Sequence, residues 1–316
     1  VDRQVSNLTR FSLHVPEKRN FFLENSDLFD DFGFRMIRPF FSRNIGLYKI
    51  NDFQYEPVPI LAGTRLSGKL NNNLLIGLLN AQTGRVPNLT IESQNYNVAA
   101  LRQQTGGKSY VGLIFVNRQA FPADSAALAN GEKKYFLDKN DYNRILGADY
   151  FYAAKNNKVA AKAFYHHSFS PNITGKTYAH ASFFLYNSTR IFTMWNHEYV
   201  GSEYNAEVGF VPRILHYNPE TNTMVKHSYW RFEPSFSYKF YPESRIINHQ
   251  VLGLNIDYYL DDYFEFLDRQ NELKYELQFQ NSSNMEVAFK NDYTRLLYPS
   301  DINGTFDSLI PAGGYS

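Results

Sequence analysis

Charged side chains of both signs alternate with apolar ones in the C-terminal third of the chain. The carboxylates could act in pairs, because glycoside hydrolysis places two carboxyl groups on either side of one bond. Cations accompany them on the same side of each segment, however, and mixed-sign charges are typical of the wall of a water-filled pore. The sequence therefore predicts a pore lining and assigns no catalytic residue. The predicted pore-lining residues are Arg231, Glu233, Lys239, Glu272, Lys274, Glu276, Glu286 and Lys290.

Four histidines raise the question of a metal site. Alternation along their segments places His166 and His180 on one polar face, and His167 and His197 on the opposite face. Zinc needs about three converging ligands with supporting hydrogen bonds. We therefore interpret these histidines as wall or interface residues and predict no metal.

Other chemistry finds little support in the sequence. Two acidic clusters, at 27–31 and 261–268, lack the twelve-residue calcium loop with its central Gly and terminal Glu. The chain contains no nucleophilic-serine elbow and no phosphate-binding glycine loop. It has no Cys, which excludes disulfides and thiolate chemistry. We predict no cofactor, and an enzyme is the less favoured interpretation.

Composition points to strands with two different faces. The 316 residues have a formal charge of +1, so nucleic acid is not an expected partner. Aromatic residues make up 17% of the chain, yet the mean hydropathy is −0.44. Polar residues must therefore be interleaved with the apolar ones, as they are in strands. No apolar run reaches the 18 residues that indicate a transmembrane helix.

The apolar positions recur with period 2. In 272–280 and 230–240 the apolar residues alternate with charged or small polar ones, and Ala179, Ala181, Phe183 and Leu185 alternate with His180 and Ser182. The candidate strands are about 10 to 13 residues long, the length that crosses a bilayer at a tilt. Apolar faces are therefore expected to meet lipid. The predicted lipid-facing residues are Trp230, Phe232, Phe236, Tyr238, Leu273, Tyr275, Leu277 and Phe279.

The connections alternate between short and long, as in outer-membrane barrels. The predicted strands are 5–14, 58–69, 74–82, 94–104, 108–118, 143–154, 158–168, 177–186, 189–200, 228–240, 244–260, 271–280 and 284–294. The fold class is thus all-β, an antiparallel up-and-down transmembrane β-barrel. Closed bacterial barrels have an even number of strands. The odd number here suggests an incomplete portion of a larger barrel, with more chain after Ser316.

Two segments within this single barrel unit, 1–316, do not fit simple strands. Residues 15–57 mix Phe with charges of both signs and are predicted to form a lumenal or plug-like segment. Residues 201–227 contain the apolar run VGFVPR and are predicted to form an outer capping loop.

Several motifs carry a family resemblance. They are NLTRFS at 7–12, PEKR at 16–19, FFLE at 21–24, FFSRNIG at 40–46, PILAGTRLSGK at 59–69, GLLNAQT at 77–83, VNR at 116–118 and VGFVPR at 208–213. Together they resemble a family of Bacteroidota outer-membrane β-barrel proteins of unknown function. Members of that family usually carry an N-terminal domain similar to family 9 carbohydrate-binding modules, which has no counterpart here. The resemblance implies architecture and location more than activity.

Three functions remain open at this point. The first is an integral outer-membrane β-barrel acting as a conduit, or as a component of a transport or assembly complex. Its expected partners are outer-membrane lipid and other outer-membrane or periplasmic proteins. The second is a membrane-bound hydrolase that acts on glycans through carboxylates in the barrel mouth. The third is a soluble carbohydrate-binding β-sandwich, whose apolar faces would be turned inward.

Overall fold

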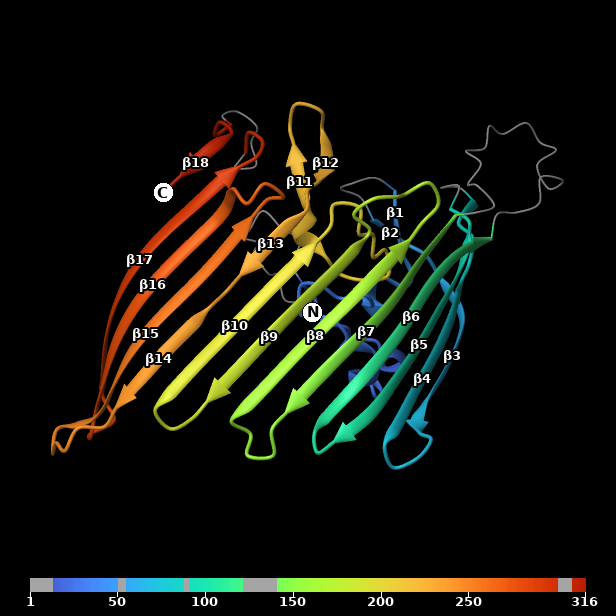
Figure 1. Ribbon diagram of the computed structural model, residues 1–316. Coiled ribbons are helices and arrows are strands. Elements are labelled where there is room, and N and C mark those ends of the chain that lie inside the picture. Colours follow the sequence, from blue (N-terminus) through green and yellow to red (C-terminus); the bar gives the residue numbers. More distant parts are fainter. Residues whose placement is uncertain (1–13, 51–54, 88–90, 122–140, 301–308) are drawn as a thin grey trace, which may run out of the picture.

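One large, curved antiparallel sheet dominates the computed structural model (Figure 1). The structure describes residues 14–50, 55–87, 91–121, 141–300 and 309–316. The sheet has 14 strands, joined in the order β18-β17-β16-β15-β13-β10-β9-β8-β7-β6-β5-β4-β3, and β14 pairs with β10 and β15. These strands are β3 (Ile60–Lys69), β4 (Leu74–Thr83), β5 (Ser93–Gly106), β6 (Ser109–Phe121), β7 (Tyr142–Ala153), β8 (Val159–Phe169), β9 (Tyr178–Asn187), β10 (Ile191–Val200), β13 (Tyr229–Phe232), β14 (Ser235–Phe240), β15 (Ile247–Leu260), β16 (Phe266–Phe279), β17 (Asn284–Leu296) and β18 (Gly313–Tyr315).

The all-β prediction is confirmed, and the up-and-down order follows the sequence. Predicted strand 5–14 lies almost wholly outside the described residues. Predicted strand 228–240 is divided into β13 and β14, because Pro234 has no N–H to give to a ladder. The backbone of Glu233 bridges the break through two hydrogen bonds with Asn196. Strand β16 begins at Phe266, five residues earlier than predicted.

The predicted portion of a transmembrane barrel is confirmed only as a large antiparallel sheet, since the described strands do not close into a barrel. Within the described residues, the first strand of the sheet, β3, does not pair with β17 or β18, so the sheet is open at both ends. Strand β18 pairs with residues 294–296 of β17, and no other described strand pairs with that edge of β17. Closure requires every strand to have two neighbours, and among the described residues β3 pairs with β4 alone.

The two faces of the sheet differ in composition. We call outer the face that carries Leu113, Leu254 and Leu273, and inner the face that carries Leu79 and Ile114. Strand registers extend both definitions across all the long strands. Large apolar side chains are exposed along the outer face from β3 to β17. A helix long and apolar enough to cross a membrane does not occur in the described part of the chain.

The N-terminal part of the chain lies in the hollow of the sheet. This inner segment, residues 14–50, contains α1 (Asn20–Leu23), α2 (Asp27–Asp30), the 3-10 helix η1 (Ser42–Asn44) and β1 (Leu47–Lys49). Strand β1 pairs with β2 (Tyr55–Pro57). Phe22, Leu28, Phe29, Phe32 and Phe40 of the inner segment pack with the apolar inner face of β4–β7. The hydrophobic core is therefore a dry layer between this segment and half of the sheet.

Glycines in the strands make this close packing possible. A Cβ atom added to Gly63, Gly77 or Gly112 would lie 2.9, 2.6 or 2.9 Å from the ring of Phe21, Phe29 or Phe32, respectively. Glycine inside a strand often marks such close packing under a large side chain. Three rings of the inner segment thus lie directly over three strands.

The chain crosses the hollow again after β10. This returning segment, residues 201–215, leads through η4 (Pro212–Ile214) into the hairpin of β11 (Leu215–Asn218) and β12 (Thr223–Lys226). Tyr204 and Ile214 pack in a second core cluster with Ile37, and Arg38 forms an antiparallel bridge with Phe210. The hairpin projects at the end of the sheet where the longer connections lie (Figure 1).

Candidate functional site: a charged wall beside a covered one

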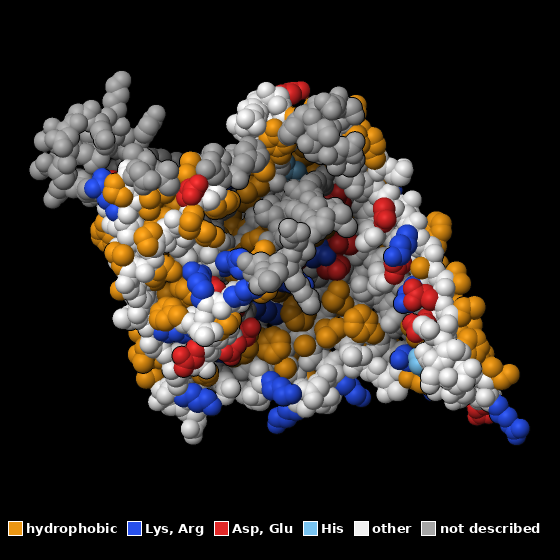
Figure 2. Space-filling view, turned by 180° about the vertical axis from the view of Figure 1, so that it is seen from behind, with side chains coloured by type: hydrophobic (Ala, Val, Ile, Leu, Met, Phe, Trp, Pro, Cys, Tyr) orange, Lys and Arg blue, Asp and Glu red, His pale blue; other side chains and the backbone are white. Residues whose placement is uncertain are grey.

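All the predicted pore-lining residues lie on the inner face. Cross-strand partners establish this: Glu198 faces Arg231, Glu272 faces Lys290, and Glu276 faces Glu286. Lys274 and Lys239 share this face through their partners Gly253 and Val251 on β15. Figure 2 shows the hollowed side, with acidic and basic side chains gathered over β15–β17. The structure therefore places the eight charges on one surface, although the described strands do not close around them into a pore.

Arg231 is the centre of one charge cluster. Its guanidinium lies 2.8 Å from Asp257, 3.0 Å from Glu198 and 3.0 Å from Glu233. Asn196 donates hydrogen bonds to both glutamates. One cation thus serves three carboxylates, so this cluster carries a negative surplus.

Lysines of β16 and β17 form the second cluster. Nζ of Lys274 lies 2.7 Å from Glu286 and 3.7 Å from Glu276, and Nζ of Lys290 lies 2.8 Å from Glu272. Glu276 and Glu286 are direct cross-strand partners, a like-charge pair that destabilises a sheet unless a cation bridges it. The Glu286 and Lys290 side chains remain about half exposed, at 46% and 55%.

All the predicted lipid-facing residues lie on the outer face. Leu273 is 51% exposed and Phe236 48% exposed, and their outer-face neighbours Val287 and Phe289 reach 60% and 71%. One apolar segment behaves differently. Ala179 and Ala181 pair with His166 and Phe164, so the apolar side of β9 faces inward and packs in the second core cluster. The sequence could not show that β9 has apolar residues on its covered face as well.

Aromatic rings gather on the outer face toward the end with the long connections. Tyr178, His180, Tyr199 and Trp230 lie within 4.5 to 6.3 Å of one another, measured between the ring centroids of contacting pairs. His197 joins them at 5.1 Å from His180. The prediction that His180 shares a face with His166 is wrong. His166 pairs with Ala179 on the inner face, and His180, the next residue after Ala179, therefore points to the outer face.

A buried charge cluster anchors the inner segment to β7 and β8. Asp149 accepts hydrogen bonds from the Gly33 N–H at 2.8 Å and pairs with Nε2 of His166 at 2.9 Å. Lys162 lies 3.1 Å from Asp149 and donates to the backbone oxygens of Asp31 and Gly33. This cluster could not be predicted from the sequence, since Asp149, Lys162 and His166 are more than 100 residues from Gly33.

Gly33 has the backbone conformation that this contact needs. Its φ of +71° lies in the left-handed region, and a Cβ atom there would lie 2.0 Å from the carbonyl oxygen of Ile37. A side chain at this position would therefore prevent the turn that brings its N–H to Asp149.

The acidic helix α2 meets cations of the sheet. Arg102 donates to the backbone oxygen of Asp27 and forms an ion pair of 3.2 Å with Asp31. Burial raises the pKa of Asp30 to about 6, although Arg38 and a hydrogen bond from Ser26 oppose this shift. Burial therefore moves the titration of Asp30 toward neutral pH.

Glu17 has the opposite behaviour at the start of the inner segment. Burial alone would raise its pKa, but hydrogen bonds from Arg19, Ser42 and the N–H of Lys18 lower it to about 2. Arg19 also donates to the backbone oxygens of Ile45 and Ser42. This network ties the entry of the inner segment to η1.

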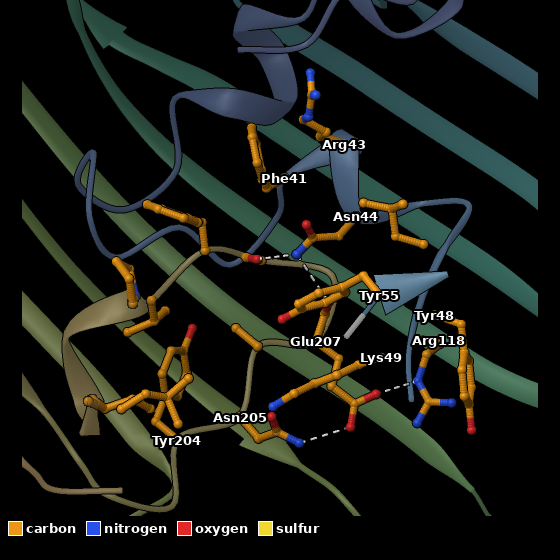
Figure 3. A pocket seen from close by; sticks show the side chains of 18 of the residues that line it. Phe41, Arg43, Asn44, Tyr48, Lys49, Tyr55, Arg118, Tyr204, Asn205 and Glu207 are labelled. Atoms are coloured by element: carbon orange, nitrogen blue, oxygen red, sulfur yellow. Dashed lines mark hydrogen bonds and ion pairs between the residues drawn. The ribbon is translucent and has the colours of Figure 1, made fainter. Parts of the chain in front are cut away.

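A cavity of about 760 Å³ opens at the end with the long connections. Its walls come from the inner segment, the returning segment and the ends of β5 and β6 (Figure 3). Arg118 lies between two carboxylates, 2.6 Å from Asp141 and 2.5 Å from Glu207. Asn44 donates to the backbone oxygens of Glu207 and Gly209, which joins the two segments that flank the cavity.

The described carboxylates of the wall and of the cavity mouth are engaged in ion pairs. Those on the wall are paired with Arg231, Lys274 and Lys290, and Asp141 and Glu207 at the mouth share Arg118. An acid–base pair needs one carboxyl group kept protonated beside an open cleft. The acidic cluster of 261–268 is likewise engaged, with Arg295 bonded to Asp261 and Glu265. Among the described residues, no group of three or more acidic or histidine side chains could hold a metal.

Comparison with known proteins adds no further assignment. No family model matches the chain, and neither a curated protein nor a solved structure matches it. The resemblance to outer-membrane barrels of Bacteroidota thus stays a prediction from the motifs.

Proposed function

We propose that this chain forms part of the wall of a bacterial outer-membrane β-barrel that acts as a conduit. The outer face would meet lipid. One half of the inner face, on β3–β8, would hold the inner segment, and the other half would meet water. The observation that carries the proposal is the continuous exposed apolar outer face opposite the charged inner face. A water-soluble sheet covers such a face with a second layer. The described strands instead form one large sheet and two small two-stranded ones.

The long strands also support this proposal. Strands β5, β6, β15, β16 and β17 have 13 or 14 residues each. A tilted strand needs about 9 to 11 residues to cross the hydrocarbon region. The open edges at β3 and β17 then favour a wall that is completed by further antiparallel strands, because lipid offers no partners to unpaired backbone groups.

Neighbouring positions on β17 provide a direct test. Val287 lies on the outer face and Ala288 on the inner face, both are exposed, and the chain has no Cys to interfere. We would introduce Val287→Cys and Ala288→Cys separately, label each with a small fluorophore and reconstitute the protein in vesicles. Brominated lipid tails should quench the label at position 287 strongly and the label at position 288 weakly.

The same labels respond differently if the sheet stays in water. Equal and weak quenching by brominated lipid at both positions would refute the membrane assignment. The reverse pattern, with position 288 quenched more strongly, would mean that the two faces have been exchanged. Leu254→Cys serves as a second outer-face position away from the sheet edge.

A further inference from the structure

The inner face is electrically divided into two halves. On β3–β8 its charged residues are Arg65, Lys69, Arg102, Arg118, Asp149 and Lys162, of which five are cations and one is a carboxylate. On β10 and β13–β17, which we call the acidic wall, eight carboxylates accompany four cations. The carboxylates are Glu198, Glu233, Asp257, Asp268, Glu272, Glu276, Glu286 and Asp292, and the cations are Arg231, Lys239, Lys274 and Lys290.

The basic half is already covered. The carboxylates of the inner segment at 24–31 lie against it, with Asp31 on Arg102 and the backbone of α2 bonded to the same side chain. Lys162 and Arg118 are at most 9% exposed, so little of their charge reaches solvent. Arg102, Arg118 and Lys162 of this half are thus each paired with a carboxylate, whereas Lys69 remains exposed.

The acidic wall has no such cover from the inner segment. Glu198 is buried, with a side chain 5% exposed, whereas the other carboxylates in ion pairs on this wall remain partly exposed, between 19% for the Glu272 side chain and 46% for that of Glu286. Arg213 of the returning segment pairs with Asp268 and adds one cation, which still leaves a surplus of three negative charges on this face. The surplus arises at two places, since Arg231 is shared by three carboxylates and Lys274 is shared by two.

We propose that the acidic wall makes the water-filled side of the conduit selective for small monovalent cations. The inference rests on the proposed function, because it needs the inner face to enclose water between low-dielectric walls. Such walls focus the field of a charged surface and enrich the counter-ion. Rings of Asp and Glu give cation channels their selectivity in the same way.

Charged thiol reagents measure this enrichment at a defined position. Ala288→Cys places a thiol on the acidic wall between Glu286 and Lys290, and Asn72→Cys places one in the exposed turn between β3 and β4. In vesicles, we would compare modification rates by trimethylammonium-ethyl and sulfonato-ethyl methanethiosulfonate. The ratio of cationic to anionic rates should be on the order of tenfold higher at position 288 than at position 72.

Two further measurements make the result specific to the wall. Adding Glu276→Gln and Glu286→Gln to Ala288→Cys should lower the rate ratio several-fold toward that of position 72. Raising the salt concentration on the unsubstituted wall should lower it as well, because ions screen the field. The salt dependence of the rate ratio can still be measured if the double substitution impairs folding.

The outcomes separate the two proposals. Equal ratios of cationic to anionic modification rates at positions 288 and 72 would overturn cation selectivity. A ratio at position 288 that changes neither with salt nor with the two Glu→Gln substitutions would overturn it as well. Fast modification of Val287→Cys in vesicles, equal to that of Ala288→Cys, would instead overturn the membrane wall on which the inference rests.

Discussion

Single residues determine how closely the inner segment can approach the sheet. Gly77 lies under Phe29 and Leu28, and Gly33 takes the left-handed turn that delivers its N–H to Asp149. Lys162, only 9% exposed, joins this contact with three oxygen partners. At these positions the absence of a side chain, or one buried charge, decides whether the segment packs.

We expect Gly77→Ala to loosen the inner segment. Its new methyl group would lie 2.6 Å from Cζ of Phe29 and 2.9 Å from a methyl of Leu28, both buried. Such overpacking costs about 1–3 kcal/mol. Gly68→Ala is the matched control, because no heavy atom lies within 4 Å of its Cβ position. Denaturant unfolding of both variants checks this, and equal stabilities would contradict the packing argument.

Removing one partner of the buried charge cluster should cost more. Asp149→Ala leaves Lys162 with a buried charge that has lost its carboxylate, a change that typically costs about 3–5 kcal/mol. Unfolding free energies in detergent test this, with Lys158→Ala in the exposed turn before β8 as the control. A loss no larger than that of the control would show that Asp149 does not stabilise Lys162.

At the scale of elements, α2 and η1 have opposite dependence on pH. The pKa of Asp30 is raised to about 6, so its contribution to stability is complete below its ordinary value of 3.8 and is lost as pH rises through about 6. The pKa of Glu17 is lowered to about 2 from 4.5, so its contribution is present above pH 4.5 and is lost as pH falls toward about 2. The docked inner segment should therefore be most stable at about pH 4 to 4.5, where Glu17 is mostly ionised and Asp30 is still mostly protonated.

Asp30→Asn should flatten the upper side of this profile. The amide keeps the size of the side chain but cannot ionise, so the fall in melting temperature between about pH 4 and 6 should shrink. The lower side, which depends on Glu17, should be unchanged. Melting temperatures measured across pH 3 to 8 for the two proteins decide the matter, and superimposable profiles would rule out Asp30 as the titrating group.

At the scale of the whole molecule, the two faces of the sheet differ in the side chains that the same strands present. The outer face presents exposed apolar side chains from β3 to β17, whereas the inner face is dry on one half and charged on the other. Two neighbouring residues on β15 illustrate this difference, since Leu254 points outward and Asn255 lies opposite Glu272 on the inner face.

In vesicles, Leu254→Arg should destabilise the protein far more than Asn255→Arg. An arginine on the lipid face near the bilayer middle costs about 2–4 kcal/mol. At position 255 the new guanidinium would meet Glu272 and water, and the cost should be within about 0.5 kcal/mol. Urea unfolding in lipid vesicles measures both. Similar losses for the two variants would argue against lipid on the outer face.

The sequence by itself determined most of the strands and the common face of the eight charged residues predicted to line a pore. Period-2 alternation is a local property, so Glu272 to Phe279 could be assigned to two faces without knowledge of their neighbours. The same holds for the position of the short turns, which depend on residues such as Asn71 and Asn156 that bond to the backbone two residues on.

Only the tertiary structure decided which apolar faces are covered and where the inner segment lies. Both faces of β9 carry apolar residues, and only its pairing with β8 shows that Ala179 and Ala181 point inward. Contacts such as Gly33 with Asp149 join residues 116 positions apart, and no local pattern encodes such a distance. The division of the inner face into a covered basic half and an exposed acidic half follows from those long-range contacts, because charge complementarity acts between surfaces that only folding brings together.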